Sequence, residues 1–324
     1  MPKAIVVHQT GGPEELRFEH VSDPAPGPGE ARVRQTAIGV NFIDVYFRRG
    51  ISKSPHFPFV PGQEAAGVVE AVGPGVADLA VGDRVAYASL QGSYAEVRLA
   101  PAARLVKLPP GIDDRTAAAM MLKGMTAEYL LRRTFKVEKG QTILVHAAAG
   151  GVGSIACQWA RHLGARVIGT AGGAEKVARA ARVCDHVIDY DKEEIVARVK
   201  ELTGGAGVNA VFDGVGQRTF EASLGSLAIR GILALFGQAS GPVPPIDPAV
   251  LARGSLYLTR PALGQYIAGR DELVTSATRL FEVVGSGAVK IEVGQSYALR
   301  DAARAHSDLE ARKTFGSTLL LPLP

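Results

Sequence analysis

The sequence predicts an α/β protein of two domains, one built on a doubly wound parallel sheet and the other a compact β domain. Its 324 residues are about twice the usual length of one domain. Short apolar runs separated by Gly and Pro occupy roughly the first 105 residues, which is typical of a β domain. From about residue 141 to residue 236, strand-like and helix-like segments alternate, which is typical of βαβ units.

The N-terminal region contains five runs rich in Val, Ile and Ala that we expect to be strands. These runs are Lys3–His8, Ala31–Val40, Ala65–Val72, Arg84–Ala88 and Tyr94–Leu99. Turn residues such as Gly73-Pro74-Gly75 and Gly82-Asp83 separate them. The spacing predicts a barrel-like domain.

The region after about residue 116 changes to a helical pattern and then to the alternating one. Thr116–Leu131 is expected to be helical with a break near Gly124. The expected strands that follow are Gln141–Ala147, Arg166–Thr170, His186–Ile188, Asn209–Phe212 and Gly231–Phe236. The expected helices between them are Gly153–Leu163, Ala174–Arg182, Lys192–Thr203 and Phe220–Leu227. Two more helices, Asp271–Ser286 and Arg300–Ala311, and a strand, Ser317–Leu321, are expected to return to the first domain.

Composition and charge exclude several classes of protein. Hydrophobic residues make up 47% and charged residues 21%, which excludes a disordered chain. The net charge of +4 is too small to predict nucleic-acid binding, although it suits an anionic small ligand. Cys157 and Cys184 belong to no Cys/His cluster, so we expect neither a disulfide framework nor structural zinc. Without a signal segment or an apolar run of transmembrane length, the expected location is cytoplasmic, with no membrane partner.

The most informative segment is a turn of small residues between an apolar strand and a helix. It has the spacing Ala147-x-x-Gly150-x-x-Gly153 and directly follows Ile143-Leu144-Val145-His146. Small residues let the backbone approach a pyrophosphate, and the helix N-terminus offers unpaired N–H groups. An ordinary tight strand–helix turn is the alternative, but the surrounding βα alternation favours a dinucleotide site. The absence of G-x-x-x-x-G-K-[ST] excludes a P-loop NTPase.

The end of the second strand indicates which dinucleotide binds. An NAD site carries an acidic residue there, whereas this strand ends at Thr170 and Lys176 follows. A 2′-phosphate would meet no carboxylate at the strand end, so NADPH is the predicted cofactor. Glu175 is interpreted as a partner of the helix dipole. Lys176 could instead be a solvated surface lysine, and Tyr190 a half-buried loop aromatic.

Several segments together resemble one family. They run from Gly140-Gln141 through Leu144 and Ala148-Ala149-Gly150-Gly151-Val152-Gly153 to Gln158 and Arg161, and include Gly39–Tyr46, Pro61–Gly67, Leu122–Ala127 and Gly254–Pro261. In these segments the chain is similar to the zinc-free quinone oxidoreductases related to zeta-crystallin, in the medium-chain dehydrogenase/reductase superfamily.

The resemblance implies a GroES-like domain of residues 1–123 and 261–324 and a Rossmann domain of residues 124–260, with NADPH in the cleft between them. The implied cofactor-binding residues are Asn41 and Thr126 near the nicotinamide, Gly150, Gly151 and Val152 on the pyrophosphate, Thr170, Gly172, Lys176 and Tyr190 at the adenosine phosphate, and Phe236, Gly237 and Ser317 along the ribose and nicotinamide rim. Val215 joins them from Gly214-Val215-Gly216, where relatives often have a hydroxyl residue at the first position.

The zinc ligands of related alcohol dehydrogenases are missing, so we expect no metal. Gly39–Asn41 contains no Cys, and Gly62-Gln63-Glu64 has Gln where those enzymes have His. Hydride transfer without a metal suits quinones and enones, whose conjugation delocalises the incoming negative charge. Tyr46 is the first candidate catalytic hydrogen-bond donor to the acceptor oxygen and Asn41 the second, with Asp44 orienting its neighbours.

The predicted activity is NADPH-dependent reduction of a small-molecule quinone, and alternatives stay open. An enone or alkenal double-bond reductase would use the same scaffold. Relatives of this fold also serve as structural lens proteins or bind RNA, but the chain has no basic stripe, so we expect no nucleic-acid partner. Alternating small and large apolar residues in Gly254–Arg260, at an expected sheet edge, predict a homodimer; pairing within the chain is the alternative.

Overall fold

The computed structural model describes residues 1–53 and 56–322. The chain divides into two compact units. Unit 1 consists of Met1–Met125, Ile267–Gly285 and Ile291–Pro324, and unit 2 consists of Thr126–Tyr266 and Ser286–Lys290. The domain boundaries after residues 123 and 260 stay predictions. No helix within the described ranges is both long and apolar enough to cross a membrane.

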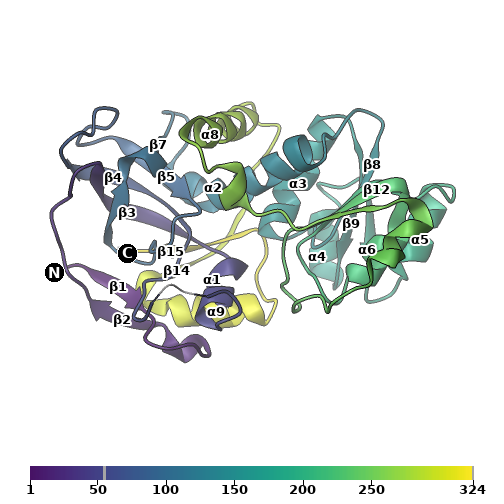
Figure 1. Ribbon diagram of the computed structural model, residues 1–324, viewed down its shortest axis with the longest axis horizontal. Helices are drawn as coiled ribbons and strands as arrows, with labels where there is room; N and C mark the ends of the chain where they lie inside the picture. Colours follow the sequence, from purple (N-terminus) through teal and green to yellow (C-terminus); the bar gives the residue numbers. More distant parts are fainter. Residues whose placement is uncertain (54–55, 323–324) are drawn as a thin grey trace. The chain divides into compact units, whose positions relative to one another are not determined.

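Unit 2 is built on a parallel sheet in the order β10-β9-β8-β11-β12-β13. Figure 1 labels β8, β9 and β12 of this sheet. The strands are β8 (Thr142–Val145), β9 (Arg166–Ala171), β10 (His186–Asp189), β11 (Val208–Asp213), β12 (Leu227–Leu235) and β13 (Tyr257–Thr259). Their apolar runs are typical of strands covered on both faces, and Leu144, Ile168, Val211 and Leu233 are fully buried. The predicted doubly wound sheet is therefore confirmed.

The helices of unit 2 cover both faces of this sheet. They are α3 (Gly151–His162), α4 (Ala174–Ala180), α5 (Ile195–Leu202) and α6 (Phe220–Ser226), with a short α7 (Leu263–Tyr266) at the end. The chain moves from β8 outward to β10 and then crosses back to β11 and β12. Because such crossovers are right-handed, α3 and α4 lie on one face and α5 and α6 on the other. The chain thus adds strands on one side of β8 first and on the other side from β11 onward. Ligands of such sheets bind at the carboxyl ends of the two strands between which this order reverses, here β8 and β11.

Unit 1 is built on a mainly antiparallel sheet in the order β14-β15-β3-β4-β5-β7, with β6 also paired to β3. The strands are β3 (Glu30–Val40), β4 (Glu64–Val72), β5 (Arg84–Ala88), β6 (Val97–Pro101), β7 (Val106–Lys107), β14 (Val293–Ala298) and β15 (Ser317–Leu321), and β1 (Lys3–Val6) pairs with β2 (Arg17–His20). The core contains Ile38, Val85, Leu105 and Leu320. The last of these belongs to β15, which pairs with β3, so the C-terminal segment completes the N-terminal sheet.

Four longer helices accompany unit 1, namely α1 (Phe42–Arg48), α2 (Asp114–Tyr129), α8 (Arg270–Gly285) and α9 (Ala302–Glu310). The predicted break near Gly124 is wrong, because α2 runs through that residue without interruption. A Cβ atom at Gly124 would lie 2.4 Å from a methyl carbon of Leu280 on α8. Glycine costs a helix about 1 kcal/mol relative to alanine, and here it allows α8 to approach α2 closely. The glycine therefore serves packing between helices.

The predicted strand Tyr94–Leu99 is displaced toward the C-terminus, and β6 begins at Val97. The amide of Tyr94 bonds to the carbonyl of Pro61 at 2.9 Å and does not take part in the ladder between β6 and β3. Strand β13 lies within Gly254–Arg260, the segment expected at a sheet edge, whereas the sequence left β2, β7, β14, α1 and α7 unpredicted. The unpredicted strands have two to six residues and the two helices four and seven, so none of them shows a clear periodic pattern.

Candidate functional site

The turn after β8 has the geometry that its small residues predict. Ala147 adopts a left-handed conformation with φ 53°, and the amide of Gly150 closes the turn on the Ala147 carbonyl at 2.9 Å. A Cβ atom at Gly153 would lie 2.3 Å from the Ala147 oxygen, so only glycine lets α3 begin so close to the strand.

The N-terminus of α3 is suited to an anion. Its N-cap is Gly150, no side chain caps it, and its first turn carries no acidic residue. The first amides of a helix have no carbonyl partner within that helix, and the helix dipole adds positive potential there. Gly151 and Val152, at the first two positions, are half-buried. This arrangement fits a phosphate group.

The end of β9 brings together some of the residues predicted for the adenosine phosphate. A Cβ atom at Gly172 would lie 2.4 to 2.6 Å from the ring and hydroxyl of Tyr190, so these two residues are in direct contact. Lys176 is half-buried near the start of α4, and residues 170–174 include no carboxylate. Thr170 is 1% exposed, and its hydroxyl lies 3.0 Å from Nδ1 of His146. The Thr170 side chain is therefore committed to a partner inside unit 2.

The loops after β11 and β12 are packed against each other. A Cβ atom at Gly214 would lie 2.9 Å from the ring of Phe236, and one at Gly237 would lie 2.4 Å from the Gly214 oxygen. The packing thus requires glycine at position 237, where the contact is with backbone, whereas a larger residue at position 214 would need only the Phe236 ring to move. The amide of Val215 donates to Asp213 at 2.7 Å, and its carbonyl accepts from Ser240. Only the side chain of Val215 is left for a ligand.

In unit 1, Asn41 directly follows β3, and Ser317 is the first residue of the neighbouring strand β15. Val40, which precedes Asn41, pairs with Thr318, which follows Ser317. The Ser317 hydroxyl donates to the Ala119 carbonyl at 2.7 Å and so is already engaged. The Asn41 side chain is 7% exposed.

Asn41 is held by a buried ion pair. Its Nδ2 donates to Oε1 of Glu64 at 2.8 Å, and the Lys123 ammonium donates to the same oxygen. The other carboxylate oxygen accepts from the amide of Leu122 at 2.6 Å. Glu64 is fully buried and Lys123 is 5% exposed, so the pair is isolated from water. This network fixes the orientation of the Asn41 amide.

A second buried cluster lies behind α1 and consists of Asp44, Arg48, Tyr94 and His306; we call it the α1 cluster. Asp44 accepts from the backbone N–H of Asn41 at 2.8 Å and from the Tyr94 hydroxyl at 3.0 Å. The same hydroxyl lies 3.0 Å from Nε2 of His306. Burial raises the pKa of Asp44 to about 7, although both hydrogen bonds oppose the change. Burial also lowers the pKa of His306 to about 3, with a further contribution from Arg48.

The remaining predicted residues have simpler surroundings. Tyr46 lies on α1, is half-buried, and has its ring 6.4 Å from that of Phe42. Thr126 is buried in α2. The predicted residues thus fall into two groups, Asn41, Tyr46 and Ser317 in unit 1 and the others in unit 2.

Sequence reasoning gave no role to His146, Asp213, Ser223, Glu64 or Lys123. Three of them lie in segments that were singled out, His146 at the turn and Glu64 and Lys123 in the resembling segments. Their charged or polar character inside apolar runs was the available signal, because such residues are rarely buried without partners.

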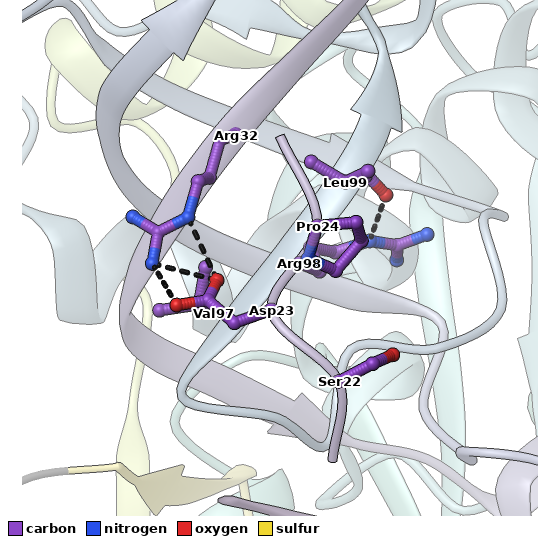
Figure 2. A pocket seen from close by; sticks show the side chains of 7 residues that line it. All are labelled: Ser22, Asp23, Pro24, Arg32, Val97, Arg98 and Leu99. Atoms are coloured by element: carbon purple, nitrogen blue, oxygen red, sulfur yellow. Dashed lines mark hydrogen bonds and ion pairs between the residues drawn. The ribbon is translucent and has the colours of Figure 1, made fainter. Parts of the chain in front are cut away.

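No group of three or more His, Cys, Asp or Glu side chains in the described part of the chain is arranged to hold a metal ion. A pocket of about 210 Å³ lies elsewhere in unit 1, and Figure 2 shows its lining residues. They are Ser22, Asp23, Pro24, Arg32, Val97, Arg98 and Leu99. Asp23 binds Arg32 at 2.9 Å, and Arg98 donates to backbone carbonyls, so both cations are already engaged. No predicted site residue lines this pocket.

Comparison with known proteins gives matches along nearly the whole chain. Residues 27–110 match the alcohol dehydrogenase GroES-like domain, and residues 151–282 match the family described as zinc-binding dehydrogenase. A quinone oxidoreductase of Pseudomonas aeruginosa is 49% identical over 99% of this chain and 100% of its own. A 2-haloacrylate reductase of Burkholderia is 46% identical, with 99% of each chain covered. The crystal structure of Escherichia coli quinone oxidoreductase complexed with NADPH has a TM-score of 0.97 at 45% identity, covering 99% of this chain and 100% of that one.

Proposed function

Because the chain belongs to the quinone oxidoreductases of the medium-chain dehydrogenase/reductase superfamily, we propose that it reduces quinones with NADPH. The observation that carries the proposal is the full-length match to a quinone oxidoreductase crystallised with NADPH, at 45% identity. The uncapped N-terminus of α3 beside the reversal of the sheet supports it independently.

The residues of unit 2 fit NADPH. The amides of Gly151 and Val152 would hold the pyrophosphate at the start of α3. Lys176 and Tyr190 would hold the 2′-phosphate beside the end of β9, where residues 170–174 are uncharged. When bound, the cofactor supplies the hydride that reduces the quinone.

Unit 1 would position the acceptor and stabilise the charge that develops on its oxygen. Nδ2 of Asn41 carries two protons, and Glu64 accepts one of them. The other is available to the acceptor oxygen, and Glu64 keeps the amide turned so that its N–H and not its carbonyl serves this purpose. Tyr46, half-buried on the same segment and the first candidate donor from the sequence, would donate its hydroxyl to the same oxygen. Fixed donors of this kind lower the barrier without rearranging during the reaction.

We propose that this reaction needs no zinc. Gln63 is 6% exposed and stands where related dehydrogenases have a histidine ligand. The neighbouring Glu64 already binds the Lys123 ammonium, Asn41 and a backbone amide, which leaves little of its charge for a metal. Dialysis against a chelator should leave turnover unchanged. Stoichiometric zinc whose removal abolishes activity would contradict the proposal.

Reduction of an activated carbon–carbon double bond is the second candidate activity. The observation that favours it is the 2-haloacrylate reductase, which matches almost the whole chain at 46% identity. A quinone and a 2-haloacrylate both accept hydride at a carbon conjugated to a carbonyl or carboxyl group.

One experiment tests the function and separates the two candidates. Oxidation of NADPH is followed with a panel of benzoquinones, naphthoquinones, enones and 2-haloacrylates. We expect kcat/KM to be highest for a quinone. Higher values for the haloacrylates or enones would favour the second candidate, and no turnover with any acceptor would contradict both. The cytoplasmic location stays a prediction.

We also propose that two copies associate through unit 2. Strand β13 is at the edge of the sheet, and three large apolar side chains near that edge are exposed: Ile229 by 79%, Tyr257 by 60% and Val250 by 37%. The strand itself is only Tyr257–Thr259, because Gly254 lies in a 3₁₀ helix. Light scattering should give about twice the 34.0 kDa chain mass, and Ile229→Lys should reduce it. A single-chain mass for the wild-type protein at micromolar concentration would contradict the dimer.

A further inference from the structure

A row of buried polar side chains crosses unit 2 at the carboxyl ends of its central strands. His146 follows β8 and is 1% exposed; its Nδ1 lies 3.0 Å from the hydroxyl of Thr170 on β9. Its Nε2 lies 3.0 Å from the hydroxyl of Ser223 on α6. Ser223 in turn donates to Asp213, the last residue of β11, at 2.7 Å. The Thr219 hydroxyl donates to the same carboxylate. We call the five residues His146, Thr170, Ser223, Asp213 and Thr219 the His146 network.

The direction of each hydrogen bond follows from Asp213. Its Oδ1 accepts from the amides of Val215 at 2.7 Å and Gly216 at 3.0 Å. Its Oδ2 accepts from the hydroxyls of Thr219 and Ser223, both at 2.7 Å. Ser223 has one proton and gives it to this carboxylate, so toward the histidine it can only accept.

His146 must therefore carry its proton on Nε2. Burial lowers the pKa of His146 and outweighs the nearby Asp213, which raises it, so the ring is neutral at neutral pH. A neutral ring protonated on Nε2 has a bare Nδ1, which accepts from the Thr170 hydroxyl. All the bonds then point the same way, from Thr170 through His146 and Ser223 to Asp213. Bonds aligned in this way strengthen one another.

The backbone around this row belongs to the predicted nucleotide site. The amide of His146 donates to the Phe212 carbonyl at 3.1 Å, and that of Ala148 donates to the Thr170 carbonyl at 3.0 Å. Between them lies Ala147, whose left-handed conformation is unfavourable for a residue with a Cβ atom and persists only where its surroundings impose it. The turn is thus held from the strand on each side.

We propose that His146 is a positioning residue of the dinucleotide site. Through Thr170 on one side and Ser223 and Asp213 on the other, it holds the loops after β8, β9 and β11 in the arrangement that binds NADPH. The inference rests on the proposed function. It also assigns a different role to Thr170, whose only hydroxyl proton is given to His146. Recognition of the 2′-phosphate is then left to other groups, Lys176 and Tyr190 among them.

Two serines of α6 provide a matched test. Ser223 and Ser226 are both fully buried, but within the described part of the chain the Ser226 hydroxyl donates to the Ala222 carbonyl of its own helix, at 2.7 Å, and not to the His146 network. Ser223→Ala should weaken NADPH binding about tenfold, which corresponds to ~1.4 kcal/mol, in a fluorescence titration. The same variant should keep kcat at saturating NADPH within about twofold of wild type, because the loss is in binding. Ser226→Ala should bind NADPH as wild type does.

A second pair of variants removes the bond at the other end of the row. Thr170→Val has nearly the same shape as threonine but no hydroxyl, whereas Thr170→Ser keeps the hydroxyl. We expect NADPH binding to weaken in the valine variant and to recover in the serine variant. The proton position is read separately, from the ring ¹⁵N shifts of His146 in the wild-type protein without cofactor.

The outcomes separate this inference from the proposed function. An Nε2–H tautomer together with weaker NADPH binding in Ser223→Ala, and not in Ser226→Ala, is the expected result. An Nδ1–H tautomer would overturn the proposal, as would equal NADPH affinity in Ser223→Ala and Ser226→Ala. If the wild-type protein did not bind NADPH at all, the proposed function would fail and this inference would fail with it.

Discussion

The two units each bury a polar cluster next to predicted binding residues, and the two clusters differ in how completely they are paired. In the His146 network, both ring nitrogens of His146 and both oxygens of Asp213 have partners. In the α1 cluster, four buried atoms have no hydrogen-bond partner among residues 1–53 and 56–322: Oδ1 of Asp44, Nε and Nη1 of Arg48 and Nδ1 of His306. Unpaired buried polar atoms are costly, and the ionisable groups beside them have strongly shifted pKa values.

The difference in pairing determines how strongly each unit responds to pH. Hydroxyls and a neutral imidazole connect the His146 network to one carboxylate, so its geometry is set by pairing and changes little with pH. The α1 cluster contains the carboxyl group of Asp44, whose pKa is about 7 and which accepts a hydrogen bond from the backbone N–H of Asn41. We therefore expect unit 2 to provide a rigid nucleotide site, and unit 1 to carry the pH sensitivity.

The largest effect is expected from Asp213→Ala. It removes the acceptor of two amides and two hydroxyls, and of these donors the Thr219 hydroxyl keeps a bond to the Gly216 carbonyl at 3.2 Å. At about 1–3 kcal/mol for each of the other three groups, the free energy of unfolding should fall by roughly 3–9 kcal/mol. Urea unfolding measures the loss. As a control, Asp247→Ala removes one exposed bond to the amide of Ala249 and should cost about 1 kcal/mol. Equal losses in both variants would mean that the network is not held through its carboxylate.

The next effect concerns pH and Asp44→Asn. The pKa of Asp44 is about 7 in the folded protein against an ordinary aspartate value of 3.8, so the folded state binds the proton more tightly than the unfolded chain does. Its contribution to stability is complete below pH 3.8 and is lost as the pH rises to about 7. Asparagine does not titrate, so the variant should gain stability relative to wild type over this range, by at most about 4 kcal/mol.

Urea unfolding of both proteins at several pH values between 4 and 8 tests this expectation. The lowered pKa of His306 makes the stability of both proteins rise with pH, in the sense opposite to Asp44. This contribution is the same in the two proteins, so it cancels when their free energies of unfolding are subtracted. A constant difference in stability across the range would show that Asp44 is ionised throughout, and the contrast between the two clusters would not hold.

Glu64→Gln should have a somewhat smaller effect on stability. It leaves the buried Lys123 ammonium without its counter-charge, at a cost of roughly 3 kcal/mol. Replacing both partners, with Lys123→Met added, should recover most of the loss, because no charge is then buried. Glu64→Gln alone should also lower kcat, because the side-chain amide of Asn41 loses its ionised acceptor. Additive losses in the double variant would contradict a coupled pair.

Lys176→Ala tests the nucleotide side. A charge-assisted contact contributes roughly 1.5–3 kcal/mol, so NADPH affinity should fall by about one to two orders of magnitude while NADH binding stays nearly unchanged. The change should appear in the KM for the cofactor more than in kcat. Lys192→Ala, which removes a mostly exposed lysine paired with Asp189, is the control. Equal harm to both cofactors would indicate that Lys176 supports the start of α4 instead.

The smallest effect is expected from Tyr46→Phe, on the acceptor side. Losing one neutral hydrogen bond of about 1.4 kcal/mol to the acceptor oxygen should lower kcat/KM for a good quinone about tenfold and leave NADPH binding unchanged. Tyr297→Phe, which loses a bond to Asp308 at 2.9 Å, should have no such effect. Unchanged turnover would make Tyr46 a packing residue, and a loss of many thousandfold would make it an essential acid.

The sequence predicts the strands and helices of unit 2 well, because apolar strands and amphipathic helices of ordinary length leave a regular pattern. The bounds of β9 and α5 in unit 2 differ by only a few residues from the expected ones. In unit 1, strand β15 also has the predicted bounds, Ser317–Leu321. A strand as short as β7 leaves no such pattern, because two residues are too few to show an alternation. Gly124 was misjudged for a different reason, since Leu280, the side chain against which it packs, is far away in the sequence.

The family resemblance, the glycine-rich turn and the absence of a carboxylate after β9 all belong to local segments, and the sequence by itself determined them. Only the tertiary structure decided which side chains within those segments are available to a ligand. It turned the Thr170 hydroxyl toward His146, used both backbone groups of Val215, and paired Glu64 with Lys123 beside Asn41. The physical reason is that a backbone turn depends on neighbouring residues, whereas the partner of a buried polar group comes from wherever the fold brings an acceptor or donor within hydrogen-bonding distance.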